Sequence, residues 1–353
     1  MELQRDAAFP VDLIRVLAIA LVILLHAAAF PYVIPQDVTP TVMWNWWTVN
    51  VYDALGRVSV PLFVMLSGAL LLDPAKVEEP LRVFFKKRFN RIGLPIIFWS
   101  VAFFAWRFYV NGETLSLNSI FQGLFSGPYN HFWFLYLLVG LYLVTPVLRV
   151  VVAYVDWKSF KYFMVLWFVG TVTLPFVSSF SPFNFNPTVF VFTGWIGYFL
   201  LGVYLQKVKV RSWILLLFVV LGFTVAIVGT YAVTAAIGER LITFFHDSLS
   251  INMIMASTAL FLLLIAIPPN RVKSRHANVN RLLHWISQNT LPIYLLHVMV
   301  LETLEMGYLG LTININTINP IIEIPLITIV TLLACAAIIY LLKKIPYVKK
   351  LIG

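Results

Sequence analysis

The chain has 353 residues, of which 61% are hydrophobic and only 11% are charged. Soluble domains are about 25% charged, so this composition excludes a soluble globular protein and indicates a membrane protein with room for roughly ten spans. The net charge of +10 does not require a nucleic-acid partner, because cytoplasmic loops of membrane proteins are rich in Lys and Arg. The single cysteine, Cys335, excludes an internal disulfide framework.

Ten apolar segments, separated by short segments rich in Pro and Asn, predict ten transmembrane helices. The first segment lacks a signal-peptide cleavage pattern, so we interpret it as a permanent span. We expect an all-α polytopic membrane protein in which residues 1–353 form a single transmembrane domain with no appended soluble domain. The predicted helices cover residues 11–34, 50–72, 92–110, 132–153, 161–179, 190–206, 212–235, 250–267, 287–306 and 325–342.

Basic residues predict the orientation of these helices. The connections that hold Lys and Arg alternate along the chain, and the residues outside this pattern are Arg15, Arg57, Arg107 and Arg240. By the positive-inside rule, the basic connections and both termini are cytoplasmic.

The first span, from Val11 to Ile34, contains Asp12, Arg15 and His26. Ionisable side chains are costly at membrane depth and by default mark a function. Arg15 and His26 are eleven positions apart, so they differ by about 20° around a helix and lie roughly 16 Å apart along it, with Arg15 nearer the cytoplasm. Asp12 is better placed to pair with Arg15 than to orient His26. The alternative is that Arg15 snorkels and His26 makes a structural contact.

Four further polar residues are predicted in the outer half of the membrane. Arg57 lies at a depth similar to that of His26 and needs an acceptor or an anionic substrate. His131 starts the fourth span within an aromatic belt, which favours an interface residue. His297 lies deeper, in the ninth span, and Glu302 is either its partner or part of the outer rim.

A basic cluster precedes the third span. Arg88 and Arg91 are three positions apart and hence neighbours on one helical face, and guanidinium groups suit phosphate. With Lys87 they could bind a phosphorylated cytosolic ligand, or serve only topology and attraction to anionic lipid. We find no metal-ligand spacing, no phosphate-binding loop and no Ser-His-Asp triad in the sequence.

Several of these residues fall in motifs that resemble the acyltransferase-3 family of integral membrane O-acyltransferases. The stretch RVSVPLF is similar to that of stand-alone sugar O-acetyltransferases, of the type acting on enterobacterial common antigen. The motifs are Arg15-x10-His26, RVSVPLFVMLSG from Arg57 to Gly68, Arg88-x-x-Arg91, HFWF from His131, YFLLGVYL from Tyr198 to Leu205, and SQNTLPIYLLH ending at His297.

The resemblance implies an enzyme of the plasma (inner) membrane that transfers an acyl group, usually acetyl from acetyl-CoA, to a hydroxyl of a cell-envelope glycan or lipid-linked saccharide. Membrane lipids would be its other partners, with no metal and no nucleic acid. The expected roles are catalysis by His26, Arg15 and Asp12, donor binding by Lys87, Arg88 and Arg91, and acceptor binding by Arg57, His297, Glu302 and His131. His26 would act as general base or carry the acyl group itself.

Two alternatives remain open at the level of sequence. Polar residues at membrane depth and helices interrupted by Pro or Gly also occur in transporters, so a glycan or glycolipid flippase would fit the same pattern. The acyl donor could also be another acyl-CoA, such as succinyl-CoA.

Overall fold

The computed structural model describes residues 10–28, 39–114, 116–180, 194–237, 243–272, 276–310, 312–313 and 318–353. The described residues form helices, turns and loops, with no β-strand among them. The basic residues Arg5, Arg240, Lys273 and Arg275, and the predicted helical residues 29–34 and 190–193, lie outside these ranges.

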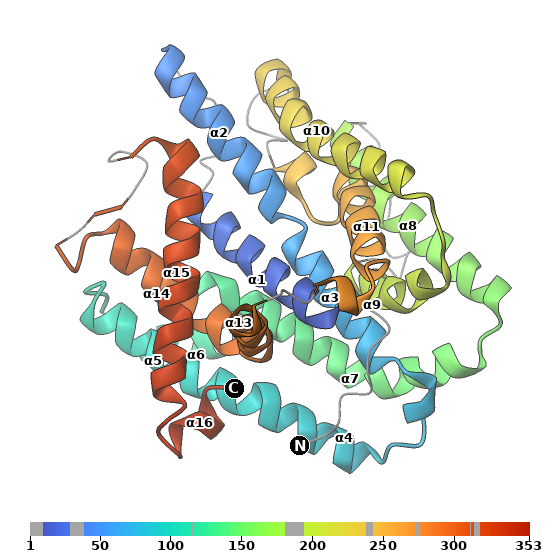
Figure 1. Ribbon diagram of the computed structural model, residues 1–353, viewed down its shortest axis with the longest axis horizontal. Helices are drawn as coiled ribbons and strands as arrows, with labels where there is room; N and C mark the ends of the chain where they lie inside the picture. The colour runs from blue at the N-terminus through green and yellow to red at the C-terminus, as the bar shows by residue number, and fades with distance from the viewer. Residues whose placement is uncertain are drawn as a thin grey trace.

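The helices follow one another as the hydrophobic pattern predicts, with additional short helices between the spans (Figure 1). The first half contains α1 (Val11–Ala28), α2 (Pro40–Gly56), α3 (Ser59–Leu71), α4 (Leu81–Arg88), α5 (Leu94–Tyr109), α6 (Leu117–Ser126), α7 (Trp133–Tyr154) and α8 (Trp157–Phe180). The second half contains α9 (Trp195–Tyr204), α10 (Ser212–Ile237), α11 (Ile251–Ile265), α12 (Pro269–Val272), α13 (Ala277–Gln288), α14 (Thr290–Glu305), α15 (Pro320–Leu342) and α16 (Val348–Leu351).

Within the described residues, eight helical segments are long and apolar enough to cross a membrane. The other two predicted spans correspond to α9 and α14, which have 10 and 16 residues. The prediction of an all-α polytopic membrane protein is confirmed. The sequence did not predict α4, α6 and α13, because these short helices lack the continuous apolar run of a span.

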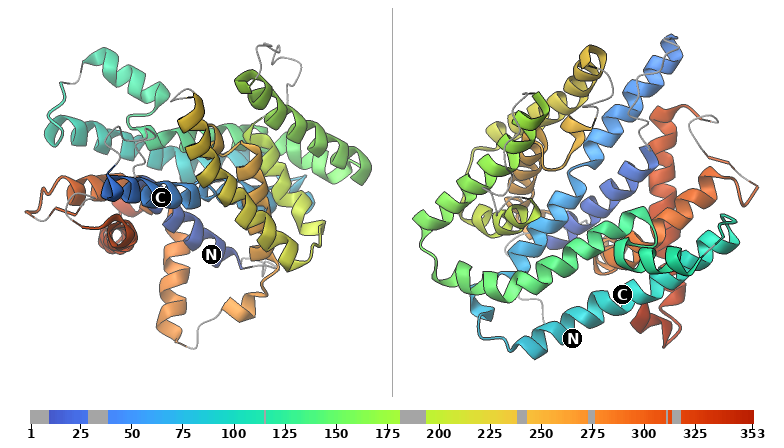
Figure 2. Two further views of the ribbon diagram at one scale, coloured as in Figure 1. Left: turned by 90° about the horizontal axis from the view of Figure 1, so that it is seen from above. Right: turned by 180° about the vertical axis from the view of Figure 1, so that it is seen from behind.

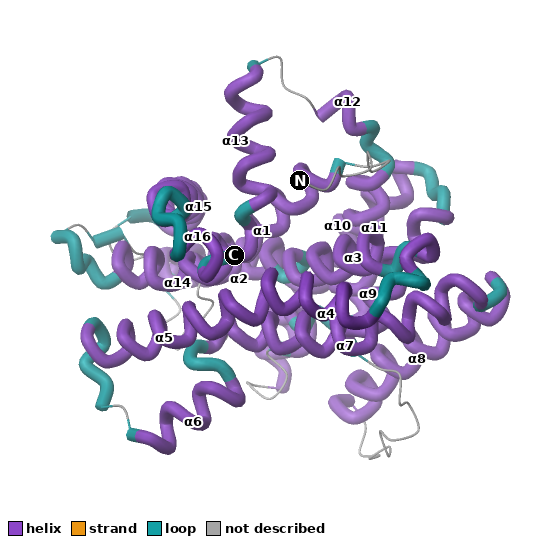
Figure 3. Tube along the Cα trace, turned by 90° about the horizontal axis from the view of Figure 1, so that it is seen from below, coloured by secondary structure: helices purple, strands orange, loops and turns teal. Residues whose placement is uncertain are grey.

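α1 lies at the centre of the structure, with α2, α3, α13, α14 and α15 packed against it (Figures 1 and 2). α13 packs beside the start of α1 and projects from the bundle, as Figure 3 shows. The ionisable residues of the first span therefore lie on a helix that is packed against other helices.

Two prolines free backbone carbonyls that other side chains bind. Pro61 lacks an N–H, so the carbonyl of Arg57 has no helical donor at that position and accepts a hydrogen bond from Ser248 Oγ at 3.2 Å. Pro325 likewise frees the carbonyl of Ile321, which accepts from Tyr52 Oη at 2.9 Å. Membrane helices tolerate proline where neighbouring groups satisfy the freed carbonyl in this way.

The short buried helix α9 packs on α3 through glycines. A Cβ placed on Gly68 would lie 1.8 Å from the carbonyl oxygen of Phe199, and one on Gly202 would lie 1.9 Å from that of Met65. Small residues allow membrane helices to approach this closely. The two motifs RVSVPLFVMLSG and YFLLGVYL thus form one helix–helix contact.

Contacts between helix ends agree with the alternation predicted from charge. Arg149, at the end of α7, binds the carbonyl of Leu71 at the end of α3. At the opposite end of α7, the hydroxyl of Tyr129 donates a hydrogen bond to Glu302 late in α14. Helix ends that the charge pattern assigns to the same side of the membrane therefore contact each other. Which of the two sides is cytoplasmic stays a prediction.

Single cysteines test the orientation. In a Cys335→Ala background, we expect Asn130→Cys to react with an impermeant thiol reagent added outside cells, and Lys86→Cys to react only after the membrane is opened. The reversed pattern would contradict the predicted orientation.

Candidate active site

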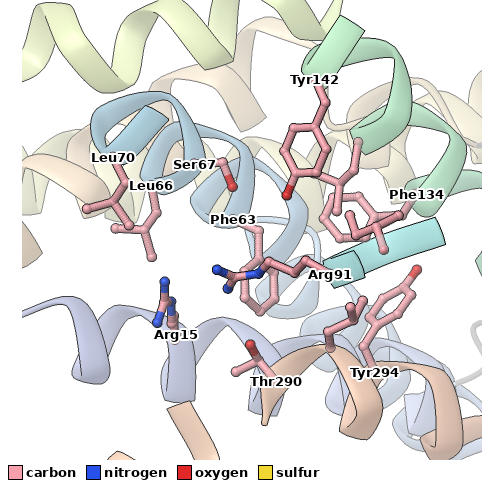
Figure 4. A pocket seen from close by; sticks show the side chains of 13 residues that line it. Arg15, Phe63, Leu66, Ser67, Leu70, Arg91, Phe134, Tyr142, Thr290 and Tyr294 are labelled. Atoms are coloured by element: carbon pink, nitrogen blue, oxygen red, sulfur yellow. The ribbon is translucent and has the colours of Figure 1, made fainter. Parts of the chain in front are cut away.

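A pocket lies between α1, α3, α7 and α14, beside the junction of α4 and α5, and encloses about 600 Å³ of empty space including its mouth. Arg15 of α1 and Arg91 extend into it from different walls, as Figure 4 shows. The other lining residues are Phe63, Leu66, Ser67, Leu70, Ile92, Phe134, Leu138, Tyr142, Thr290, Leu291 and Tyr294. No acidic side chain is among these lining residues, so two positive charges meet in a largely apolar hollow, which suits an anionic ligand.

Arg91 reaches the pocket from a π-helical turn, Phe89–Gly93, that joins α4 to α5. Such turns widen the helix and are frequent at functional sites. Arg88 does not line the pocket, and its guanidinium packs over the rings of Phe84 at 5.4 Å and Tyr142 at 5.6 Å. Because Tyr142 lines the pocket, Arg88 supports that wall from behind. A common helical face for the two arginines stays a prediction.

Arg149 fixes the segment that carries these residues. This buried side chain, 3% exposed, donates to the carbonyl of Leu71 at 2.7 Å and binds the Glu79 carboxylate at 2.8 Å. Lys87 is paired with the same carboxylate at 3.0 Å. Burial alone would raise the pKa of Glu79, but the hydrogen bonds from Arg149 and Lys87 outweigh it and lower that pKa. The sequence indicated only a topological role for Arg149. Lys87, which was expected to bind the donor, does not line the pocket.

Three histidines lie close together next to the pocket. The ring centroid of His297 lies 5.0 Å from that of His26 and 5.4 Å from that of His131. His297 Nδ1 contacts the carbonyl of Tyr294, while its Nε2 is buried with no hydrogen-bond partner among the described residues. His26 is partly buried, whereas His131 and His297 are buried. Residues distant in sequence are thus brought together around His26.

His131 is 1% exposed and lies in a short 3₁₀ turn, Asn130–Phe132, just before α7. Its ring packs edge-on against Phe103 at 4.9 Å, and its carbonyl accepts a hydrogen bond from Tyr294 Oη at 2.6 Å. The preferred interpretation of His131 as an interface residue is therefore wrong. The aromatic belt around it indicated depth along the membrane but could not show that the turn folds inwards.

Tyr294 connects the pocket to the histidines. It lines the pocket, and its ring centroid lies 5.5 Å from that of His297 and 5.7 Å from that of His131. Phe134, another lining residue, packs against Tyr294 at 5.3 Å. Tyr294 therefore lies between the arginine-lined pocket and the three histidines.

Glu302 does not pair with His297. Its carboxylate accepts a hydrogen bond from Trp106 Nε1 at 2.7 Å and a second from the hydroxyl of Tyr129. Of the two interpretations of Glu302, a pairing with His297 is therefore excluded. Glu302 instead belongs to a polar group between α5, α14 and the turn before α7.

Asp12 binds α13 rather than Arg15. Its carboxylate contacts His284 Nδ1 at 2.8 Å and accepts from Ser287 Oγ at 2.6 Å. The expected pairing with Arg15 is replaced by this contact, because α13 packs against the start of α1. Asp12 therefore acts on the site by fixing the helix that carries Arg15 and His26.

Arg57 follows Gly56, the residue at which α2 touches α1 next to His26. A Cβ on Gly56 would lie 2.8 Å from Leu25 Cα, so the backbones of α2 and α1 touch one residue before each of these side chains. The charge of Arg57 acts electrostatically on His26. The Asp53 carboxylate holds Arg57 through Nε at 2.9 Å and Nη2 at 3.1 Å.

Asp53 in turn contacts His246, which the sequence did not single out. His246 is fully buried, and its Nε2 lies 2.9 Å from Oδ1 of Asn50. The spacing of Asp53 and Arg57, four residues apart, could have predicted their pairing on a helix. No local signal connects His246 to them, since it lies almost 200 positions further along the chain.

Among the described residues, no group of three or more His, Cys, Asp or Glu side chains is arranged to hold a metal ion. The site therefore consists of cations, histidines and hydrogen-bonding groups on apolar helices.

These apolar helices around a pocket with buried polar groups define a multi-pass membrane protein with an internal site. A family model described as an acyltransferase domain, Acyl_transf_3, matches residues 11–340, nearly the whole chain. The chain therefore belongs to the acyltransferase-3 family and is a membrane acyltransferase. No curated protein and no solved structure matched it.

The close contact of α1 and α2 can be tested with matched glycine variants. Gly56→Ala places a methyl group against Leu25, and overpacking of this kind typically costs about 1–3 kcal/mol. We expect a lower unfolding temperature in detergent and reduced acyl transfer, because His26 and Arg57 move apart. Gly140→Ala, whose methyl group meets nothing within 4 Å, is the control. Equal behaviour of the two variants would contradict this account.

Proposed function

We propose that the chain transfers an acetyl group from cytosolic acetyl-CoA to a hydroxyl of a cell-envelope glycan or lipid-linked saccharide. The observation that carries the proposal is the position of His26. It follows Arg15 along α1, and its ring centroid lies 5.0 Å from that of His297, which packs against Tyr294 in the lining of the arginine-lined pocket. One helix thus connects an anion-binding hollow to a buried group of imidazoles.

The pocket suits an acyl-CoA donor. Arg15 and Arg91 supply the positive charge that CoA phosphates need, and guanidinium groups bind phosphate in a fixed geometry. The apolar lining, including Leu66 and Leu138, suits the less polar arm that carries the thioester. In this arrangement Arg88 and Lys87 support the pocket from outside, and the thioester points towards Tyr294.

His26 would act in one of two ways. As a general base, it takes the proton of the acceptor hydroxyl while the oxygen attacks the thioester carbonyl, and the leaving CoA thiolate then recovers that proton. As a carrier, its ring nitrogen first displaces CoA to form an acyl-imidazole, which the acceptor hydroxyl then attacks. A neutral imidazole suits either task.

The acceptor would approach from the opposite side of His26. Arg57 would stabilise the oxyanion that forms at the carbonyl. His131 and His297 shape the buried wall, and the Glu302 carboxylate, already bonded to Trp106, offers a further acceptor for sugar hydroxyls. We place the enzyme in the plasma (inner) membrane and favour the stand-alone sugar O-acetyltransferase type, on the likeness of RVSVPLF.

Replacement of His26 tests the chemistry. His26→Ala should lower transfer of label from acetyl-CoA to the acceptor by at least about 10²-fold while the protein stays folded and inserted. His276→Ala, at an exposed position before α13, is the control. Near-normal turnover by His26→Ala would remove His26 from the mechanism.

Replacement of the basic residues tests the donor site. Arg91→Gln should raise the KM for acetyl-CoA about tenfold or more, since a hydrogen bond to a charged group contributes about 1.5–3 kcal/mol. Arg88→Gln should have a smaller effect, because Arg88 packs on Phe84 and Tyr142 instead of lining the pocket. The exposed Arg82→Gln on α4 is the control. An unchanged KM in Arg91→Gln would leave these residues only a role in topology.

A further inference from the structure

Beyond Arg57, a buried chain of polar side chains continues away from His26. It runs from Arg57 through Asp53 to His246 and ends at Asn50. His246 is 0% exposed, Asp53 is 2% exposed and Asn50 is 0% exposed. Burying such groups is costly, and the roles proposed for Arg57 alone do not explain the other three.

The hydrogen bonds of Asn50 determine where one proton of His246 lies. Asn50 Nδ2 donates to the carbonyl of Ile227 at 3.1 Å, so the oxygen of the amide faces His246. An amide oxygen only accepts, and it lies 2.9 Å from His246 Nε2. His246 Nε2 therefore carries a proton and donates it to Asn50.

The other nitrogen of His246 faces the Asp53 carboxylate. A hydrogen bond between these two atoms needs one further proton, held either as an imidazolium beside a carboxylate or as a neutral imidazole beside a carboxylic acid. The two forms have the same total charge. The pair formed by His246 and Asp53 is therefore neutral in either case.

This neutrality changes what Asp53 does to Arg57. A two-pronged contact from a lone carboxylate would fix the guanidinium and also cancel its charge. When the carboxylate shares a proton with His246, the contact still fixes Arg57, but the set of three side chains retains one positive charge.

We propose that His246 and Asp53 are positioning residues, which hold Arg57 beside His26 while their shared proton prevents Asp53 from cancelling the charge of Arg57. The inference rests on the proposed function, in which Arg57 stabilises the oxyanion. Asn50 orients His246, and the contact of Gly56 with Leu25 brings the assembly to the catalytic histidine. The Asp247 carboxylate acts on Arg57 as a further, separate charge.

Two substitutions separate anchoring from charge. Asp53→Asn removes the two-pronged anchor but leaves the positive charge of Arg57. His246→Gln removes the shared proton but leaves the Asp53 anchor, so the pair of Asp53 and Arg57 becomes neutral. We expect Asp53→Asn to lower kcat on the order of 10²-fold through misplacement of Arg57, and His246→Gln to lower it at least about tenfold. The KM for acetyl-CoA should stay the same in both.

A double-mutant cycle tests whether these residues act through Arg57. In an Arg57→Gln background, neither His246→Gln nor Asp53→Asn should lower kcat further. If His246→Gln lowers kcat by the same factor in both backgrounds, its role is general to the structure and the inference is wrong. Glu113→Gln, which removes a carboxylate from Arg107 at the surface, is the control.

A spectroscopic measurement tests the proton independently of activity. In bilayers, ¹⁵N spectra of histidine-labelled protein should contain one histidine with a protonated Nε2 and an Nδ1 that shares a proton, and this signal should be absent from His246→Gln. An unprotonated Nε2, or an Nδ1 without a shared proton, would overturn the inference even if the enzyme is active. If the proposed function itself is wrong, the unmodified enzyme transfers no label from acetyl-CoA. That result is distinct from a failure of the kinetic or the spectroscopic test of His246.

Discussion

Where α1 crosses α2, the backbone at Leu25 leaves no room for a side chain at Gly56. The residues that follow are His26 on α1 and Arg57 at the end of α2, and the charge of Arg57 acts electrostatically on His26. Because α1 is a continuous helix, the same contact fixes Arg15 about 16 Å away in the pocket. The proposed donor and acceptor regions are therefore held at a distance determined by helix geometry, and the packing of α13, α14 and α15 on α1 keeps that helix in place.

The cost of burying charge explains the arrangement of the remaining polar groups. Arg149 is bound by Glu79 and two backbone carbonyls, Arg57 by Asp53, and Asp12 by α13. Arg15, which is partly buried, and Arg91, which is exposed, differ because they face one pocket whose described lining contains no carboxylate. Two like charges beside one hollow repel each other unless an anion lies between them. The repulsion between these two charges therefore favours the pocket as a binding site.

The sequence predicted those features that depend on one helix or on helix order. The stripe of Arg15 and His26 and the depth of Arg57 followed from helix periodicity and from charge bias in the connections. It was wrong about His131 and did not predict the π-helical turn that carries Arg91, since an inward turn and a π-helical turn leave no clear pattern in composition. The pairing of Asp53 with Arg57 could have been predicted from their spacing of four residues on a helix. The contact of His246 with Asp53 could not, because only tertiary packing brings these two residues together.

The central claim is that a donor bound on one side of the membrane acylates an acceptor reached from the other. The most direct test uses liposomes with protein of one determined orientation and labelled acetyl-CoA supplied on a single side. We predict label in a lipid-linked saccharide only when acetyl-CoA is on the side of α4, with the labelled sugar on the opposite face. Equal transfer from either side, or transfer only from the face of Tyr129, would contradict the account.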